Sequence, residues 1–141
     1  VSTIDELANG AFAPVIPEVD DGIADARRVV LCSGKLYYEL VAERRERRIT
    51  DVAIVRVERL YPIPGVELRA AIDRFPGAEL VWAQEEPRNM GAWPMYDEWL
   101  RDLFGDGAVR YAGRPAAAAT ATGFPQKHAA QQSALIDDAL R

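Results

Sequence analysis

The hydrophobic and polar positions of this chain repeat in a strand-then-helix order along most of its length. Four short apolar runs, at residues 29–32, 52–57, 80–83 and 109–111, show little polar alternation. Such continuous runs are typical of strands that are buried on both faces of a sheet. The fourth run has three residues and is the weakest of the set.

A segment with helical spacing follows each run. In the first segment, Leu36 with Leu40 and Tyr37 with Val41 lie four residues apart, which places each pair on a shared face of a helix. Alternating strands and helices of this length predict an α/β fold with three layers, a mostly parallel sheet with helices on both faces. We expect at least four parallel strands, with the first two paired to each other. The predicted helices cover residues 35–48, 66–75, 95–103 and 128–140.

The start of the chain departs from this pattern. It contains two prolines and the acidic segment 18–21, without a useful helical or strand period. We predict an extended leading arm at residues 1–26, lying outside an α/β domain at residues 27–141. Within the arm, Ser2 stands three residues before Asp5, as in a capped helical turn.

Charge and composition narrow the function classes. The formal net charge of -5 argues against an extended nucleic-acid surface, because such surfaces concentrate positive charge. One cysteine and one histidine are too few for a zinc site of the usual ligand count. No apolar run approaches the roughly 20 residues that span a bilayer, and the start lacks a secretory pattern. We therefore expect a cytoplasmic protein without nucleic-acid or membrane partners, or a mitochondrial-matrix protein if the source is eukaryotic.

A basic cluster at residues 44–48 interrupts this acidic background. It closes the first predicted helical segment. We expect it to be the solvated carboxyl end of that helix, where cations meet the negative end of the helix dipole.

The loops that leave the carboxyl ends of parallel strands are where such folds bind ligands. The first of them, Ser33-Gly34-Lys35, precedes a helix and could hold an anion there. A P-loop also needs a glycine five residues before the Gly-Lys pair, and Val29 stands at that position. The pattern therefore favours a tight turn over a nucleotide site.

The third loop carries adjacent carboxylates at Glu85 and Glu86. A general base or metal ligand would use such residues, but neighbouring side chains at a strand end point in different directions. No second Asp, His or Cys cluster lies nearby in sequence. We expect carboxylates fixed at a subunit or domain boundary, and a loop at residues 84–93 that supports a protein contact through Trp93.

His128 is the one conventional base for neutral pH. A serine or cysteine catalytic triad would need His128 beside Ser33, Ser133 or Cys32. No usual nucleophile motif surrounds those residues. The positive amino end of the last helix disfavours protonation of the imidazole. We expect a neutral imidazole that makes a structural hydrogen bond.

Long stretches of the chain resemble the end of 2-oxoglutarate dehydrogenase. Transketolases and pyruvate dehydrogenases share the architecture, but not the run of Glu85-Glu86-Pro87, Asn89 and Gly91-Ala92-Trp93. The alternatives are a free-standing non-catalytic α/β binding module, or the equivalent domain of another 2-oxo acid dehydrogenase or of a transketolase. The resembling stretches are residues 28–40, 51–64, 81–93 and 110–116, together with His128, Gln131, Gln132 and residues 138–140 of the closing helix.

The resemblance implies an enzyme that binds thiamine diphosphate and magnesium, decarboxylates 2-oxoglutarate and passes a succinyl group to a lipoyl-bearing succinyltransferase. It also implies a homodimer whose cofactor site is built by earlier domains. We therefore expect no catalytic, cofactor-binding or metal-binding residue in this chain, which would pack beside the active-site domains and help to hold the dimer. Because the sequence begins at Val1, a fragment or split subunit is favoured over a free-standing module.

Interface and regulatory roles remain for the loop residues. As the resemblance implies, actinobacterial relatives bind acetyl-CoA near the arm and the second strand's loop, through cations that are missing here. Glu67 adds a carboxylate that would repel a phosphate. We expect no acetyl-CoA activation, with Arg59 as the one possible replacement cation. The candidate residues are Ser33, Lys35, Arg59, Glu85, Glu86, Asn89, Trp93, Arg114 and His128.

Overall fold

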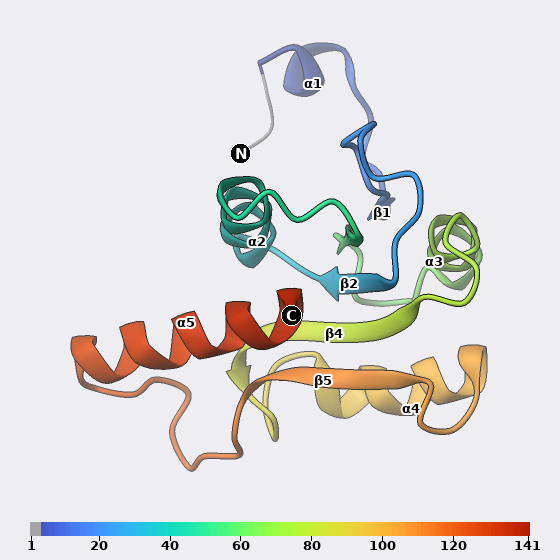
Figure 1. The fold of residues 1–141 in the computed structure, drawn as a ribbon. Helices are drawn as coiled ribbons and strands as arrows, with labels where there is room; N and C mark the ends of the chain where they lie inside the picture. Colours follow the sequence, from blue (N-terminus) through green and yellow to red (C-terminus); the bar gives the residue numbers. More distant parts are fainter. Residues whose placement is uncertain (1–3) are drawn as a thin grey trace.

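Five strands form one sheet in the order β1-β3-β2-β4-β5, with helices packed against it, in the computed structural model (Figure 1). The structure describes residues 4–141. The four predicted strands and the four predicted helices are all present, with shifted ends. The strands are β1 (Val15–Ile16), β2 (Arg28–Cys32), β3 (Val52–Val57), β4 (Glu79–Pro87) and β5 (Val109–Arg114); the helices are α1 (Ile4–Asn9), α2 (Leu36–Glu46), α3 (Gly65–Ile72), α4 (Trp93–Phe104) and α5 (Pro125–Leu140).

The strands β2 to β5 run parallel to one another. In register, Val29 of β2 lies beside Ala53 of β3 on one side and Leu80 of β4 on the other. Leu80 in turn lies beside Val109 of β5. The predicted parallel pairing of the first two strands is therefore confirmed.

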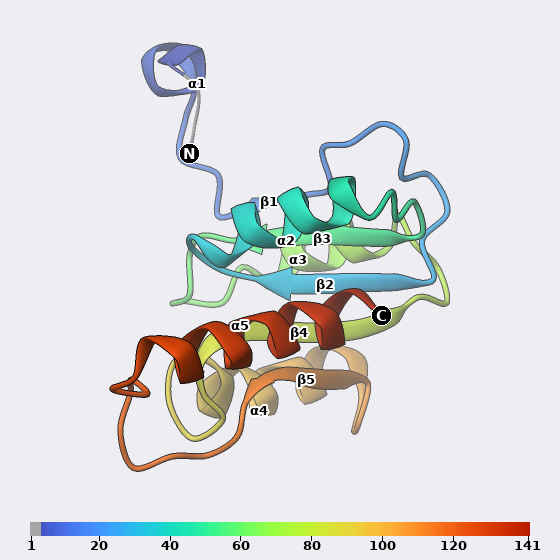
Figure 2. The ribbon, with the colours of Figure 1, turned by 60° about the vertical axis from the view of Figure 1, so that its left-hand side comes forward.

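Helices cover both faces of the sheet, so the predicted three-layer α/β fold is confirmed. Figure 2 shows α2 and α5 on one face and α3 and α4 on the other. Successive strand residues point to opposite faces, so Val29 and Leu31 pack toward α3 and α4 while Val30 and Cys32 pack toward α2 and α5. Each face has its own apolar core.

The second half of the predicted arm belongs to the domain. Val15 pairs with Val57 in an antiparallel edge strand, and the Pro14 carbonyl accepts the Glu58 backbone N–H at 2.9 Å. Ile23 is buried in the core beneath α3. The expectation that residues 1–26 lie outside is therefore wrong for residues 15–26, because a strand of two residues is too short to show a period in sequence.

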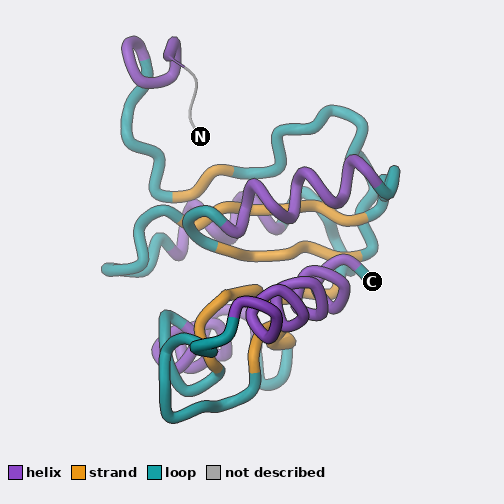
Figure 3. The backbone as a smooth tube through the Cα atoms, turned by 90° about the vertical axis from the view of Figure 1, so that its left-hand side faces the viewer, coloured by secondary structure: helices purple, strands orange, loops and turns teal. Residues whose placement is uncertain are grey.

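The remaining part of the arm carries the short helix α1, which stands apart from the sheet (Figure 3). Its Ile4 and Leu7 are exposed. Asn9 Nδ2 donates to Asp5 Oδ1 at 2.7 Å, so the predicted helical turn is present. The capping role predicted for Ser2 lies outside the described residues.

Arg44 is buried, with 1% of its side chain exposed, against the expectation of a solvated basic cluster. Its Nη1 donates to Glu18 Oε2 and to the Val52 carbonyl, and its Nη2 donates to Glu18 Oε1 at 3.0 Å and Asp20 Oδ2 at 2.5 Å. Glu18 Oε2 also accepts the Ile54 backbone N–H at 2.7 Å.

The position of Arg44 on α2 explains its burial. Arg44 follows Tyr37 and Leu40 on the inner face of α2 and reaches the segment after β1. The other arginines of the cluster are exposed.

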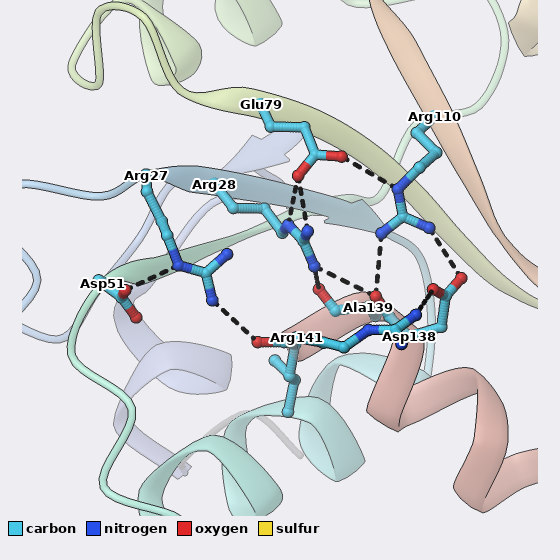
Figure 4. A network of polar contacts seen from close by, with 9 residues as sticks. Arg27, Arg28, Asp51, Glu79, Arg110, Asp138, Ala139 and Arg141 are labelled. Atoms are coloured by element: carbon cyan, nitrogen blue, oxygen red, sulfur yellow. Dashed lines mark hydrogen bonds and ion pairs between the residues drawn. The ribbon is translucent and has the colours of Figure 1, made fainter.

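Arginines from the strands fasten the carboxyl end of α5 (Figure 4). Arg28 Nη1 donates to the carbonyls of Asp138 and Ala139, and Arg110 donates to the Asp138 carbonyl and carboxylate. Glu79 bridges the two arginines. Burial raises the pKa of Glu79, but the hydrogen bonds from Arg28 and Arg110 outweigh it, and the pKa lies below its ordinary value. Cations here satisfy the free carbonyls of a helix end.

Removing the Glu18 carboxylate should leave the buried Arg44 with Asp20 as its remaining carboxylate partner and the Ile54 backbone N–H without an acceptor. We expect Glu18→Ala to lower the free energy of unfolding by about 3–5 kcal/mol, measured by urea unfolding. Asp21→Ala is the matched control, because Asp21 is an exposed acid of the same segment and its loss should change little. Equal stability of the two variants would contradict a stabilising role for the buried pair.

Candidate functional site

The first loop and the end of β4 meet through Lys35, at the carboxyl ends of the strands. Its Nζ lies 2.7 Å from Glu39 Oε1 in α2 and 2.5 Å from Glu85 Oε1 near the end of β4. Gln132 of α5 donates to Glu39 Oε2 at 2.7 Å and to Glu85 Oε1 at 3.1 Å. Two of the predicted candidates, Lys35 and Glu85, are thus in direct contact, and Glu39 and Gln132, which were not among the candidates, complete the group. We call Lys35, Glu39, Glu85 and Gln132 the Lys35 cluster.

The Lys35 cluster holds one positive and two negative side chains, so the charge of Lys35 is more than matched by its neighbours. Hydrogen bonds to Glu39 and Glu85 raise the pKa of Lys35. Burial raises the pKa of Glu39, but the bonds from Lys35 and Gln132 bring it below the ordinary value. A lysine held between two carboxylates is a poor anion ligand, so the cluster ties α2, β4 and α5 together instead.

The Ser33-Gly34-Lys35 loop is the tight turn that its sequence favours. Gly34 has a φ of 62°, in the left-handed region that glycine enters without strain. Ser33 is half-buried, and no hydrogen bond of its hydroxyl is seen among residues 4–141. The geometry favours a structural role for this loop.

The loop predicted at residues 84–93 begins only after Pro87, because β4 continues to that residue. Gln84, within β4, organises the turn that follows, although it was not among the predicted candidates. It is 4% exposed. Its Oε1 accepts the Trp82 indole N–H at 3.1 Å and the Trp93 backbone N–H at 2.9 Å. Its Nε2 donates to the Met90 carbonyl at 2.8 Å, with longer bonds to two other loop carbonyls. One amide therefore closes the whole turn; the available sequence signal was a polar residue ending a buried strand.

Two glycines let the backbone pack against this amide. Gly91 has a φ of 66°, and a Cβ there would lie 3.0 Å from Gln84 Nε2. A Cβ on Gly113 of β5 would collide with the Tyr111 hydroxyl and lie 2.8 Å from the Gln84 carbonyl oxygen. The Tyr111 hydroxyl, which has one proton to donate, lies 3.1 Å from the Glu86 carbonyl oxygen and 3.0 Å from the Arg114 carbonyl oxygen. Close contact between β5 and the loop depends on both glycines.

Glu86 and Asn89 lie on the outer side of the same loop. The Glu86 side chain is exposed, away from the Lys35 cluster, so the adjacent carboxylates do face different surroundings, as expected. Asn89 exchanges two hydrogen bonds of 3.0 Å with the Ala117 backbone. It therefore fixes the small-residue loop that follows β5.

Trp93 is a core residue, 5% exposed, and its side chain is not free to anchor a partner. Its ring packs 5.1 Å from Tyr111, centroid to centroid. The residue is the first of α4, and the helix direction turns the indole toward the sheet. The expectation that Trp93 anchors a protein contact is therefore wrong for this domain. A protein contact through the exposed residues of the same segment stays a prediction.

Arg59, Arg114 and His128 do not join the Lys35 cluster through any contact between the described residues. Arg59 donates to the Pro62 carbonyl at 3.2 Å and lies 3.7 Å from Glu67. Its charge thus faces a carboxylate, and the absence of acetyl-CoA activation stays a prediction. His128 is exposed, and among residues 4–141 its imidazole makes no hydrogen bond of the kind expected. Arg114 is buried at the end of β5.

The described residues offer few groups for catalysis. Cys32 is fully buried, and burial raises the pKa of its thiol. Within residues 4–141 no group of three or more His, Cys, Asp or Glu side chains could hold a metal ion. In the same residues no helix is long and apolar enough to cross a membrane.

Replacing Gln84 by Leu keeps its size but removes both ends of the amide. The Trp93 N–H and the Met90 carbonyl would lose their partner, so we expect the free energy of unfolding to fall by about 2 kcal/mol or more. Hydrogen exchange at the Trp93 amide should also become faster. Glu86→Gln, an exposed change in the same loop, is the control; unchanged exchange in Gln84→Leu would show that the amide does not hold the turn.

Comparison with known proteins agrees with this fold and with the loop motifs. A family model described as "2-oxoglutarate dehydrogenase C-terminal" matches residues 1–140. The 2-oxoglutarate dehydrogenase E1 component of Brucella anthropi is 52% identical over 99% of this chain, and that of Brucella abortus is 53% identical over 83% of it. The chain spans 16% and 12% of the length of these two relatives.

The solved structure of a protein described as a split gene transketolase, an inactive beta4 tetramer, is similar with a TM-score of 0.54. The similarity covers 92% of this chain and 42% of that chain, at 16% sequence identity, and it confirms the transketolase-like fold alone. The family match over 140 residues and the identity of more than half to the curated relatives establish the closer relationship: this chain belongs to the 2-oxoglutarate dehydrogenase C-terminal family.

Proposed function

We propose that this chain is the carboxy-terminal domain of a thiamine-diphosphate-dependent 2-oxoglutarate dehydrogenase and that it supports assembly of that enzyme. The observation that carries the proposal is the 52% identity to an E1 component over 99% of the chain. The whole enzyme would decarboxylate 2-oxoglutarate and transfer a succinyl group to the lipoyl group of a succinyltransferase. We assign it to the cytoplasm of a bacterium, as a homodimer.

The cofactor site belongs, in this proposal, to other domains of the enzyme. Magnesium held with a diphosphate needs oxygen ligands that converge. The acidic side chains of the Lys35 cluster already face Lys35 and Gln132. The described residues therefore do not fit thiamine diphosphate and magnesium, and no step of the reaction is assigned to them.

A supporting role needs a surface for the rest of the enzyme. Tyr61 is 73% exposed and packs its ring 5.9 Å from that of Trp99, centroid to centroid. Met95 precedes Trp99 by one helical turn on the same face of α4 and is 37% exposed. Tyr61, Met95 and Trp99 together form what we call the Tyr61 surface. An exposed apolar surface of this kind is typical of a protein contact.

The free-standing binding module remains the second candidate. One observation favours it: the polar groups of the Lys35 cluster, and those that Gln84 contacts, find their hydrogen-bond partners within this domain. A module of that kind would be functional without a catalytic polypeptide, whereas the proposed domain acts only as part of one.

The proposal predicts that residues 1–141 alone neither bind thiamine diphosphate with magnesium nor release carbon dioxide from 2-oxoglutarate. Calorimetry with the cofactor and an assay of decarboxylation check this, with the full polypeptide that carries the domain as the positive control. Saturable cofactor binding by residues 1–141 would place the active site here. An inactive full polypeptide would favour the free-standing module.

Tyr61→Ser should weaken assembly while leaving the fold intact, because the side chain is mostly exposed in this domain. We expect a loss of about 2 kcal/mol in the free energy of dimerisation of the full polypeptide, as for other aromatic residues at interfaces. Sedimentation measures the dissociation constant, and urea unfolding checks the fold. Val19→Ser, which also removes an exposed apolar side chain, is the control. Equal dimerisation of both variants would contradict a role for the Tyr61 surface.

A further inference from the structure

A cavity of 390 Å³ lies where the end of β5, the loop at residues 115–122 and the first turns of α5 meet. Figure 2 shows this loop running outward from β5 before it returns to α5. Arg114, Lys127 and Gln131 supply the polar side chains with the longest reach, and the alanine-rich loop supplies most of the remaining wall. The small side chains leave the loop backbone close to the cavity.

The charge of this lining is positive without compensation. Arg114 and Lys127 line the cavity, and no acidic side chain does. Four further cavities in residues 4–141 each combine basic and acidic side chains, as Arg56 and Glu58 do in one of 500 Å³. The chain as a whole has a net charge of -5, so a cavity lined by cations without carboxylates differs from its surroundings. Its positive potential would attract an anion.

Arg114 is the buried member of the lining, with 8% of its surface exposed. Its Nη2 donates to the Thr120 carbonyl, but its buried Nε has no hydrogen-bond partner. No ion pair of Arg114 is seen among the described residues. A buried guanidinium is costly unless an anion pairs with it. The cavity beside Arg114 is where such an anion can enter.

The amino end of α5 contributes a second positive element. The helix has 16 residues, its N-cap Phe124 provides no side-chain hydrogen bond, and its first turn contains no acidic residue. The first intrahelical bond given by its amides is that of His128 to the Phe124 carbonyl. The amides of Gln126 and Lys127 therefore have no intrahelical acceptor, and Lys127, which lines the cavity, lies at the positive end of the helix dipole.

We propose that this cavity binds the phosphate group of a small molecule. Phosphate suits the site because it carries up to two charges and several acceptor oxygens, which can meet the side chains of Arg114, Lys127 and Gln131 near the positive end of α5. The cavity admits either free phosphate or a phosphate monoester. The site is independent of the proposed enzyme activity, because it uses residues that no step of that activity requires.

Calorimetric titration of the full chain with inorganic phosphate, and separately with glycerol 3-phosphate, tests the site. We expect saturable binding that weakens as salt is added. Lys127→Glu should weaken it by about tenfold or more, because a repulsive charge replaces an attractive one. Tighter binding of glycerol 3-phosphate would identify a monoester as the ligand, and equal affinities would identify free phosphate.

Arg114→Gln should remove binding, and circular dichroism checks that this variant remains folded. Should it unfold, the exposed Lys127 still decides the question, since Lys127→Glu changes a surface side chain. Arg101→Gln is the matched control, because it removes one exposed cation from another helix. No saturable binding of either probe, or equal binding by Lys127→Glu and the unmodified chain, would overturn the proposal.

Discussion

In the centre of the sheet, β2 has no exposed residue, and Val29, Val30, Leu31 and Cys32 are each 0% exposed. A strand in this position must be covered on both faces, because its apolar side chains alternate between them. That requirement places α2 and α5 on one face and α3 and α4 on the other. It also leaves the strand ends as the places where polar side chains can reach one another.

Those polar side chains are mostly occupied with holding the fold together. Glu18 and Arg44 join the arm to α2, Arg28 and Arg110 hold the end of α5, and Gln84 closes the loop after β4. Burying such groups is tolerated because nearly every donor finds an acceptor. The result is a domain whose strand ends are joined to neighbouring elements by hydrogen bonds, in keeping with the supporting role that we propose.

The pairing of donors with acceptors also distinguishes the Lys35 cluster from the cavity at the start of α5. In the Lys35 cluster, positive and negative groups from three elements satisfy one another, so little capacity for an outside ligand remains. At the cavity, Arg114 is only partly satisfied, and the helix end has no acidic residue. Whether the cation is paired with carboxylates, rather than the presence of a lysine or an arginine, separates a structural cluster from a candidate ligand site.

The sequence by itself determined the α/β class, four strands, four helices and the family, because apolar period and long consecutive motifs are local properties. It could not place Arg44 or Gln84, whose partners depend on the fold: Glu18 lies 26 residues from Arg44, and the Gln84 amide acts only once its loop has turned. Trp93 was ambiguous for the same reason, since core and interface aromatics look alike in sequence. Tertiary structure decided these positions because burial and pairing of polar groups are set by which elements pack together, and a two-residue edge strand such as β1 gains its hydrogen bonds only from a neighbour already in place.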